Sequence, residues 1–279
     1  MEVELVVTLV INIHNSGSTI AEVLQTWFET CADLTQLEIL AVCDGCTDDS
    51  VGECNRWSAE HPGVDMKVLH TPDVWEIKAN NAALKRASGE IVIFAQDDNT
   101  MHTFGWDQIV CDIFEKPCVG AVGLLAGLRF TSPLAYLRVE AYTPHKGNTW
   151  IAECPADARY VHVVDAINRP FAVRTAELRS FGGLCEDYCP LEWDDADLCM
   201  VLRKLGYHIL YAPLDCVNST RRMKTLGPGR MDDDFKRGKA IFQARHIPYL
   251  NGPCFHSAFG FWGALRNVNS LYNVQALRG

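Results

Sequence analysis

The first hundred residues alternate between short apolar runs and amphipathic stretches, and this alternation constrains the fold more than any other feature of the sequence. The apolar runs are rich in β-branched residues and predict strands over residues 3–13, 37–44, 64–70 and 91–95. The stretches between them carry helical signals and predict helices over residues 20–31, 47–57 and 77–88. Repeated strand–helix–strand units with short joints imply an α/β fold with a mostly parallel sheet flanked by helices.

Three further segments complete this outline. Thr19 and Glu22 have the spacing of a capping box at the start of the first helix. The apolar run 119–130 predicts one more buried strand. The charged segment that follows Asn218 contains Gly and Pro, and it predicts a loop that leads into a helix.

Composition limits the classes of partner. The chain has 279 residues, of which 48% are hydrophobic, enough for one large α/β domain or two small ones. Its net charge of -10 has the wrong sign for general attraction to nucleic acid or to an anionic membrane. We therefore expect a small-molecule ligand or a neutral acceptor and no nucleic acid. Peripheral membrane contact stays open, because the aromatic segment 255–277 can pack on the sheet, cover a cleft, dimerise or rest on a membrane.

The beginning of the chain and its cysteines point to the cytoplasm. The opening residues carry acids where a secretory signal needs basic residues, and their apolar run is too short to span a bilayer. The 12 cysteines are scattered through apolar patterns, which favours free thiols in a reducing compartment. Cys43 and Cys46 form a CxxC pair without a second pair, so a structural zinc site is not favoured.

Acidic residues stand at three strand ends or helix starts. Asp44 follows the second predicted strand, Asp97 and Asp98 follow the fourth, and Asp194 and Asp195 precede a later helix. Ligands of open α/β sheets bind beyond the carboxyl ends of the strands, where carboxylates can hold Mg²⁺ or Mn²⁺ against a diphosphate. A further acid on the other side of a sugar can act as a general base. The alternative is that these residues only cap helices and make turns.

At this point the chain resembles a known family, the inverting family 2 glycosyltransferases with the GT-A fold. The resemblance covers about residues 4–218 in family order. The segments that carry it are "INIHNSGSTI", "LEILAVCDGCTDDS", "NNAALKRASGEIVIFAQDDN" and "RPFAVRTAELRSFGGLCEDYCPLEWDDADLCMVLRKLGYHILYAP". Each motif is weak alone, and their agreement in one order makes chance unlikely to explain it.

The resemblance implies a domain plan and an activity. Residues 1–218 would form the glycosyltransferase domain, with a nucleotide-binding half (1–100) and an acceptor and catalytic half (101–218), and residues 219–279 would add a lid and helical extension on the same domain. The implied reaction moves a hexosyl or deoxyhexosyl group from a nucleoside-diphosphate sugar to a hydroxyl of a glycan or other acceptor, with inversion. A uridine- or thymidine-linked donor is favoured. The oligomeric state is not implied.

On the donor side, the resemblance implies roles for individual residues. His14 would pack against the nucleobase, with Asn15 beside it, and Asp44 would accept the imide hydrogen of the base. Asp98 would be the main ligand of Mn²⁺ or Mg²⁺, and Asp97 would contact the sugar or ribose. A histidine at a strand end and a helix-capping aspartate are the alternatives for His14 and Asp44.

On the catalytic side, Asp195 stands at the position of the family's general base, and Asp194 precedes it. Lys78 would face the diphosphate or remain solvated. Gly183 would let the backbone approach the sugar or only make a turn. Asn218 matches a position where the family commonly has a metal-binding His, and its amide oxygen is a weaker ligand of the same kind of cation.

The sequence departs from the family pattern at Gln96, which replaces the first acid of the DXD motif. Gln96 and Asn218 support an alternative in which the protein binds a nucleotide sugar without catalysis. A sugar nucleotidyltransferase is a further alternative, but it would be expected to have a basic Gly-rich phosphate loop near the first strand. A basic segment around "LGPG" is either a lid over the diphosphate or an exposed loop; its basic residues are Arg221, Arg222, Lys224 and Arg230.

Overall fold

The computed structural model describes residues 6–131, 138–143, 151–153, 162–190, 192–219 and 228–250. The helices are α1 (Ile20–Glu29), α2 (Ser50–Glu60), α3 (Glu76–Leu84), α4 (Trp106–Phe114), α5 (Thr175–Ser180), α6 (Asp194–Lys204) and α7 (Pro228–Leu250), with 3₁₀ turns η1 (Leu34–Gln36) and η3 (Glu186–Tyr188). The first strands are β1 (Val7–Ile13), β2 (Leu37–Asp44), β3 (Asp65–Thr71), β4 (Ile91–Gln96), β5 (Asn99–Met101), β6 (Val119–Gly123) and β7 (Gly127–Thr131). They are followed by β8 (Arg138–Thr143), β9 (Ile151–Glu153), β10 (His162–Val163), β11 (Ala166–Ile167), β12 (Phe171–Arg174), β13 (His208–Tyr211) and β14 (Cys216–Asn218).

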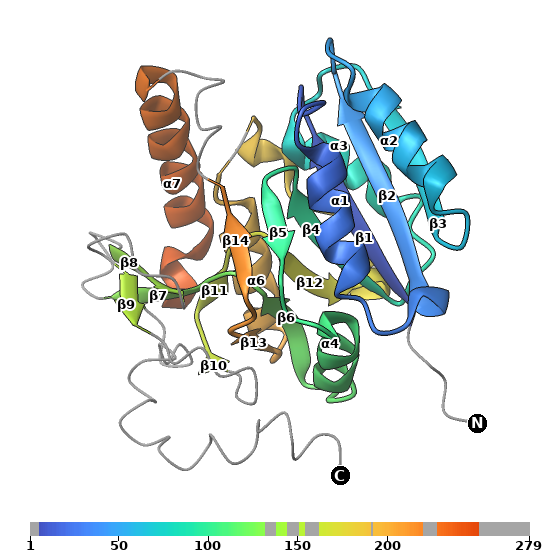
Figure 1. Cartoon of the computed structure of the whole chain (residues 1–279). Coiled ribbons are helices and arrows are strands. Elements are labelled where there is room, and N and C mark those ends of the chain that lie inside the picture. Colours follow the sequence, from blue (N-terminus) through green and yellow to red (C-terminus); the bar gives the residue numbers. More distant parts are fainter. Residues whose placement is uncertain are drawn as a thin grey trace.

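One eight-stranded sheet runs through the molecule, in the order β10-β13-β6-β12-β4-β1-β2-β3 (Figure 1). The strands β3, β2, β1 and β4 are mutually parallel, as the alternating pattern of the first hundred residues predicts. β12 lies antiparallel between β4 and β6, and it joins the two halves of the sheet. The prediction of a mostly parallel sheet flanked by helices is confirmed.

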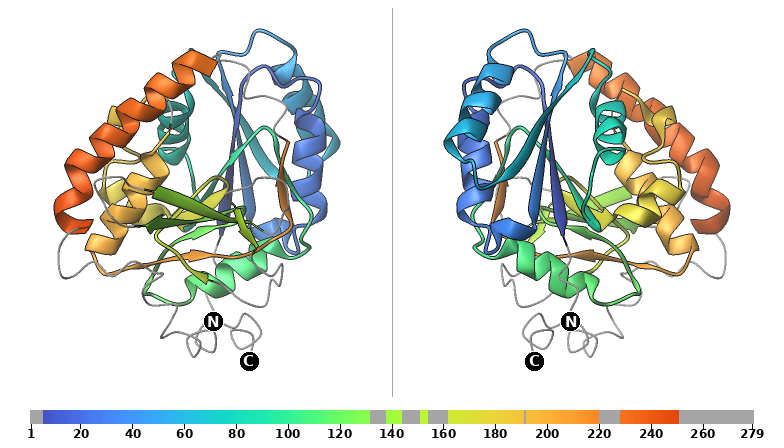
Figure 2. Two further views of the ribbon diagram at one scale, coloured as in Figure 1. Left: turned by 90° about the vertical axis from the view of Figure 1, so that its left-hand side faces the viewer. Right: turned by 90° about the vertical axis from the view of Figure 1, so that its right-hand side faces the viewer.

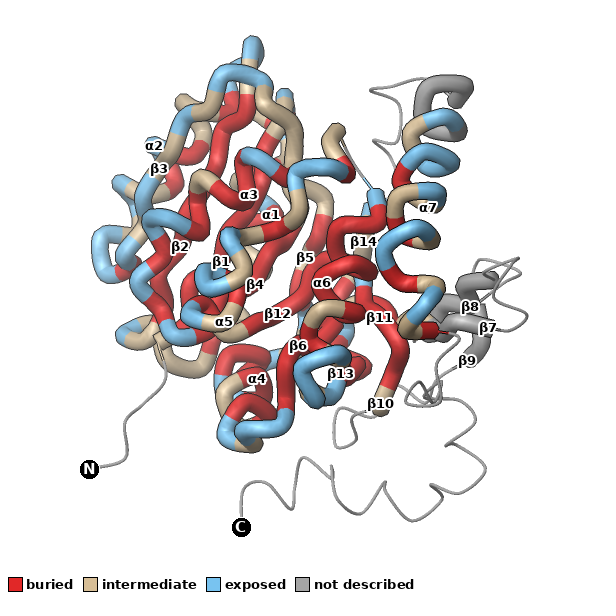
Figure 3. Tube along the Cα trace, turned by 180° about the vertical axis from the view of Figure 1, so that it is seen from behind, coloured by how far each residue is buried: buried red, intermediate tan, exposed pale blue. Residues whose placement is uncertain are grey.

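Helices cover both faces of this sheet (Figure 2). One apolar cluster packs α1, α2 and α4 against one face, and a second packs α3, α5, α6 and α7 against the other. The central strands are buried throughout their length, as the red core of the trace in Figure 3 shows. This burial explains why their sequences read as continuous apolar runs instead of alternating ones.

The run 119–130 does not form the single strand that its composition suggests. It divides into β6, which belongs to the large sheet, and β7, which belongs to a four-stranded sheet of order β11-β7-β8-β9. Glycines permit this change of direction, because a Cβ at Gly123 would lie 2.6 Å from the carbonyl oxygen of Ala126 and one at Gly127 2.6 Å from Val164. A continuous apolar run therefore does not show that its residues form a single strand.

The capping box expected at α1 is also not formed. Thr19 is the N-cap residue, but its side chain makes no capping hydrogen bond. The hydroxyl of Thr19 instead donates to the carbonyl oxygen of Ser16 at 3.4 Å, and the same carbonyl accepts from the backbone N–H of Thr19 and Ile20. A turn at Ser16 therefore starts the helix, because its carbonyl engages the hydroxyl that the box would have used.

Several sequence-based expectations fall on parts of the chain outside the described residues. These are the basic residues Arg221, Arg222 and Lys224, most of the acceptor-side segment 129–160, and the C-terminal segment 251–279. Arg230 falls within α7. Within the described ranges, none of the helices combines the length and the apolarity needed to cross a membrane.

Candidate active site

The carboxyl ends of β1, β2 and β4 meet at one edge of the sheet. The register pairs Ile13 with Cys43 and Asn12 with Gln96, so the residues that follow these strands come together. Three predicted site residues, His14, Asp44 and Asp97, lie at this edge. Parallel pairing of neighbouring strands is therefore the local reason that residues more than 80 positions apart meet.

The imidazole of His14 has a fixed orientation. Its Nδ1 lies 2.7 Å from the carbonyl oxygen of Asp44, so Nδ1 carries a hydrogen and donates it. Its Nε2 then accepts from Nδ2 of Asn15 at 3.2 Å. Asn15, at φ 53, also accepts from the backbone N–H of Thr47 at 2.7 Å and so ties the loop after β1 to the loop after β2.

The carboxylate of Asp44 is buried and bound by the loop after β3. Oδ1 accepts from the hydroxyl of Thr71 at 2.7 Å and from the N–H of Val74 at 2.8 Å, and Oδ2 accepts from the N–H of Trp75 at 2.8 Å. A carboxylate offers about four lone-pair sites, and these bonds use three of them. Asp44 thus shapes the loop ahead of α3 and keeps the capacity for one further donor.

Asp97 and Asp98 are adjacent in the sequence but contact different segments of the chain. Asp97 Oδ2 accepts from the N–H of His14 at 3.0 Å and from the hydroxyl of Ser16, and so holds the loop that follows β1. Asp98 lies in the turn between β4 and β5, where its carbonyl oxygen accepts from the N–H of Ser219 at 3.0 Å. β5 and β14 form an antiparallel ribbon in which Asn218 pairs with Asn99. The structure therefore brings Asp98 and Asn218 close together.

The donors at this ribbon suit a hard divalent cation. Asp98 supplies a carboxylate and Asn218 an amide oxygen, both of which Mg²⁺ and Mn²⁺ accept as ligands. Within the part of the chain that the structure describes, no group of three or more His, Cys, Asp or Glu residues could hold a metal ion. Asp98 and Asn218 are thus two oxygen donors, fewer than the full ligand shell of such a cation.

Asp194 and Asp195 occupy the first turn of α6, and both are buried. Asp194 forms a two-pronged ion pair with Arg169, with Nη2 to Oδ2 at 2.5 Å and Nη1 to Oδ1 at 3.4 Å. Asp195 Oδ1 accepts from the N–H of Ala196 at 2.7 Å. Burial raises the pKa of Asp195 well above its usual range, and the charge of Asp194 acts in the same direction, while Arg169 opposes both.

Glu76 links the two groups of acids, and sequence reasoning missed it. Its Oε1 lies 3.0 Å from Nε of Arg169 and accepts from Nε2 of Gln96 at 3.0 Å, so a chain of contacts runs from the end of β4 to α6. Burial raises the pKa of Glu76, and Arg169 partly offsets this effect. Neither Glu76 nor Arg169 belongs to a local sequence motif. Their importance is recognised only from the contacts that they make in the folded protein.

The two remaining predicted residues lie on or beside α3. Lys78 is in the first turn of this helix and is exposed. Gly183 has φ +97, and a Cβ there would lie 2.5 Å from Oδ1 of Asn81. Asn81 accepts from the N–H of Leu184 and donates to its carbonyl oxygen, so Gly183 allows this turn to dock on α3.

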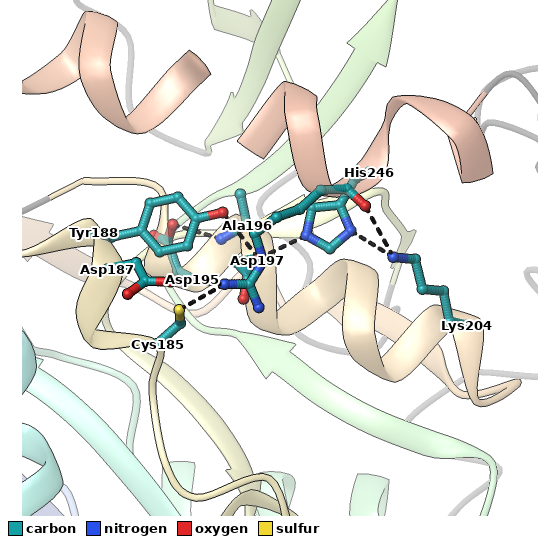
Figure 4. Close-up of polar contacts among 9 residues, drawn as sticks. Cys185, Asp187, Tyr188, Asp195, Ala196, Asp197, Lys204 and His246 are labelled. Carbon is teal, nitrogen blue, oxygen red and sulfur yellow. Dashed lines mark hydrogen bonds and ion pairs between the residues drawn. The ribbon is translucent and has the colours of Figure 1, made fainter. Parts of the chain in front are cut away.

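A second polar network ties α6 to α7 (Figure 4). Asp197 Oδ1 accepts from Tyr188 at 2.9 Å and from Nε2 of His246 at 2.6 Å, and it lies 3.1 Å from Nε of Arg245. Nδ1 of His246 accepts from Nζ of Lys204 at 2.9 Å. The contacts at Asp197 therefore fix α6, the helix that carries Asp195, to α7 and η3.

Comparison with known proteins identifies the family. The sequence model of "Glycosyl transferase family 2" matches residues 8–154, more than half of the chain. The chain belongs to glycosyl transferase family 2. The match contains His14, Asp44, Asp97 and Asp98, and it ends before α6.

Similar proteins agree with this assignment. The probable glycosyltransferase YdaM of Bacillus subtilis (strain 168) is 21% identical over 221 residues, 74% of this chain and 49% of the relative, so the chain spans about half the length of that protein. The mannosyltransferase PcManGT of Pyrobaculum calidifontis, solved with GDP-Man and Mn²⁺, superposes with a TM-score of 0.59 at 17% identity, over 99% of this chain and 83% of its own. TarS 1-349 of S. aureus, solved with UDP-GlcNAc, gives 0.57 at 15% identity, over 89% and 67%. The fold is thus of the GT-A type seen in glycosyltransferases.

Proposed function

We propose that this family 2 glycosyltransferase moves a sugar from a nucleoside-diphosphate donor to an acceptor hydroxyl with inversion, using Asp195 as general base. The observation that carries the proposal is the pairing of two sites. Oxygen ligands for a cation, Asp98 and Asn218, lie at the β5–β14 ribbon, and a separate buried carboxylate stands at the start of α6. The contacts through Gln96, Glu76 and Arg169 connect the two.

The donor site would form at the carboxyl ends of β1 and β2. The remaining acceptor capacity of Asp44 suits the imide N–H of uracil or thymine, and the oriented ring of His14 beside it offers a flat face for the base. Mn²⁺ or Mg²⁺, when bound by Asp98 and Asn218, would neutralise the departing diphosphate. Relatives in fold were solved with GDP-Man and with UDP-GlcNAc, so the nucleobase is a point to be measured.

On the other side of the sugar, Asp195 would accept the proton of the acceptor hydroxyl as its oxygen attacks the anomeric carbon. The bond between that carbon and the diphosphate breaks on the opposite face, and this geometry inverts the configuration. A raised pKa makes a carboxylate a stronger base, which suits proton removal from a hydroxyl near neutral pH.

Calorimetric titration with UDP, TDP and GDP, each with and without Mn²⁺, tests the donor site. We expect a pyrimidine diphosphate to bind more tightly with the metal, and Asp98→Ala to weaken that binding by about tenfold or more, since a charged metal contact is lost. Asp65→Ala is the matched control, because Asp65 starts β3 at the opposite edge of the sheet and is exposed.

Two results would contradict the proposal. If none of the three nucleotides binds in any condition, the transferase function is wrong as stated. If a nucleotide binds but Asp195→Asn hydrolyses or transfers the donor sugar as fast as the wild type, Asp195 is not the base. Binding without turnover in the wild type, across a panel of sugar donors, would favour the non-catalytic alternative that Gln96 and Asn218 suggest.

A further inference from the structure

Arg169 joins two helices that are distant in the sequence. It lies in the turn between β11 and β12, and only 8% of its side chain is exposed. Its guanidinium contacts Asp194 of α6 through Nη1 and Nη2 and Glu76 of α3 through Nε. The two Nη atoms donate hydrogen bonds to Asp194, whereas the contact between Nε and Glu76 is an ion pair that does not have hydrogen-bond geometry.

The charges around this guanidinium are mostly acidic. Asp195 is faced by its neighbour Asp194 and by Glu192 from the segment before α6, and the thiol of Cys199 lies one turn further along α6. Glu76 of α3 is faced in turn by Asp194 and by Asp97 from the turn after β4. Arg169 is the cation that opposes these acids in the interactions of both Asp195 and Glu76. Without it, the buried carboxylates would repel one another at the start of α6.

We propose that Arg169 is a positioning residue for the transfer: it clamps Glu76 and Asp194 together and so fixes the first turn of α6, with Asp195 in it, beside the donor site. This inference rests on the proposed role of Asp195 as base. Arg169 acts through Asp194 and Glu76 and is assigned no contact with the substrate. Its charge also sets the pH at which Asp195 becomes ionised.

The direction of that effect follows from the charges. Burial and the charge of Asp194 raise the pKa of Asp195, and the positive charge of Arg169 lowers it. Loss of that positive charge makes the ionised form less favourable, so the pKa of Asp195 rises further. At a pH where the wild-type carboxylate is ionised, the variant would then be protonated and unable to accept a proton.

The test is a direct titration of Asp195 by NMR, in protein labelled with ¹³C at the aspartate Cγ atoms. Asp195→Asn identifies the resonance. In Arg169→Met we expect its midpoint to move upward by about one pH unit or more, the usual effect of an opposite charge within reach of a carboxylate. Arg169→Lys keeps the positive charge without the double contact, so its Asp195 midpoint should lie between those of the wild type and Arg169→Met. An unchanged midpoint in a folded Arg169→Met protein would overturn the proposal.

The matched control is Arg203→Met. Arg203 lies on α6, the helix that carries Asp195, and its half-buried side chain forms an ion pair with the buried Asp165, so this variant also removes a cation that is paired with a buried carboxylate. It should leave the Asp195 midpoint within a few tenths of a pH unit. An equal shift in Arg203→Met and Arg169→Met would show a general loss of packing and would count against the specific role of Arg169.

A second variant covers the case in which Arg169→Met does not fold. Arg169→Met combined with Asp194→Asn removes one charge of each sign, so the two electrostatic effects on Asp195 oppose each other. We expect its midpoint to return toward the wild-type value. A midpoint that lies about one pH unit or more above the wild-type value in the double variant, or that rises in Asp194→Asn alone, would contradict the clamp.

Nucleotide binding separates this inference from the proposed function. If UDP, TDP and GDP fail to bind the wild type, the proposed function fails, while the titration still reports whether Arg169 controls Asp195. If the wild type binds a nucleotide and folded Arg169→Met loses that binding, Arg169 contacts the ligand directly and the positioning role is wrong. The expected result is retained nucleotide affinity with an altered pH dependence of donor turnover.

Discussion

Asp195 is held where its ionisation is unfavourable. It is buried in the first turn of α6 next to a second aspartate, and both features raise its pKa. The start of a helix normally favours acids, because the helix dipole and free N–H groups stabilise negative charge. Asp194 has Arg169 as its counter-ion. The repulsion between the two neighbouring carboxylates therefore acts mainly against the ionisation of Asp195. The property that suits a base therefore makes this residue unfavourable for stability.

Asp195→Asn should stabilise the protein at pH 7. Because the pKa of Asp195 is raised by folding, the folded state binds its proton more tightly than the unfolded chain, and the wild-type free energy of unfolding falls as pH rises above about 4, the usual aspartate value. Asn does not ionise and escapes this loss. We expect a higher melting temperature for the variant at pH 7, with each kcal/mol appearing as about 2–4 °C.

Calorimetric melting from pH 7 down to pH 4 measures this effect. The difference between the two proteins should narrow toward the acidic end, where the wild-type carboxylate is protonated in both states. Asp65→Asn, an exposed aspartate on β3, should show little difference at any pH. A variant that melts below the wild type at pH 7 would show that the charge of Asp195 stabilises the fold.

At the scale of elements, α7 packs along α6 and supports it. His246 is 1% exposed, and its two nitrogens contact Asp197 and Lys204 of α6. Phe242, one turn earlier, packs on Trp193, the residue that precedes α6. The helix α6 thus contacts Arg169 through Asp194 and α7 through Asp197 and Lys204.

His246→Leu should weaken this support. The leucine fills the space but removes the hydrogen bond to the buried Asp197, which keeps Tyr188 and Arg245, while the exposed Lys204 turns to water; the loss of one such bond costs about 1 kcal/mol. We expect a lower urea midpoint and faster amide hydrogen exchange along α7. Lys236→Ala, at an exposed position of the same helix, should change neither. Unchanged exchange in His246→Leu would mean that packing of Phe242 and its neighbours alone holds α7.

Local pattern predicted the elements of the first half well. The strand over 37–44 and the three helices that precede residue 90 were expected from spacing alone, because each buries one continuous apolar surface. The division of 119–130 into β6 and β7 was missed, since the residues of the run are almost all apolar and the pattern does not show a change of sheet. The hydroxyl of Thr19 was expected to cap α1, but it donates to the carbonyl oxygen of Ser16 instead.

The site was predictable where neighbouring strands end together and was not where distant elements meet. His14, Asp44 and Asp97 follow three adjacent strands, and their strand ends are visible in the sequence. The role of Arg169 and Glu76 can be recognised only from their ion pairs with each other and with Asp194, which join segments about 120 residues apart in the sequence. No residue spacing encodes such a contact.

At the scale of the whole molecule, one sheet spans both halves of the chain. β12 pairs with β4 on one side and with β6 on the other, so the first hundred residues and the residues after them share a continuous hydrogen-bonded framework. Apolar clusters on both faces combine residues from before and after residue 101. We therefore expect the two halves to unfold as one cooperative unit.

Cysteine reactivity tests this expectation. Cys54 on α2 and Cys199 on α6 are both buried, on opposite faces of the sheet and in different halves of the chain. Alkylation across a urea series, read for each cysteine by mass spectrometry, should give the same midpoint for both. Cys118 is exposed and should react without urea. A lower midpoint for Cys199 would show that the second half opens independently.

The position of β12 also affects how the protein is made on the ribosome. After β4 has emerged from the exit tunnel, one of its edges has no neighbour, because the strand that pairs there comes much later, at residues 171–174. Until then a fully apolar strand presents unpaired N–H and C=O groups, which is the kind of surface that aggregates or recruits chaperones. During synthesis, the edge of β4 therefore stays unpaired until β12, which belongs to the second half of the chain, has been made.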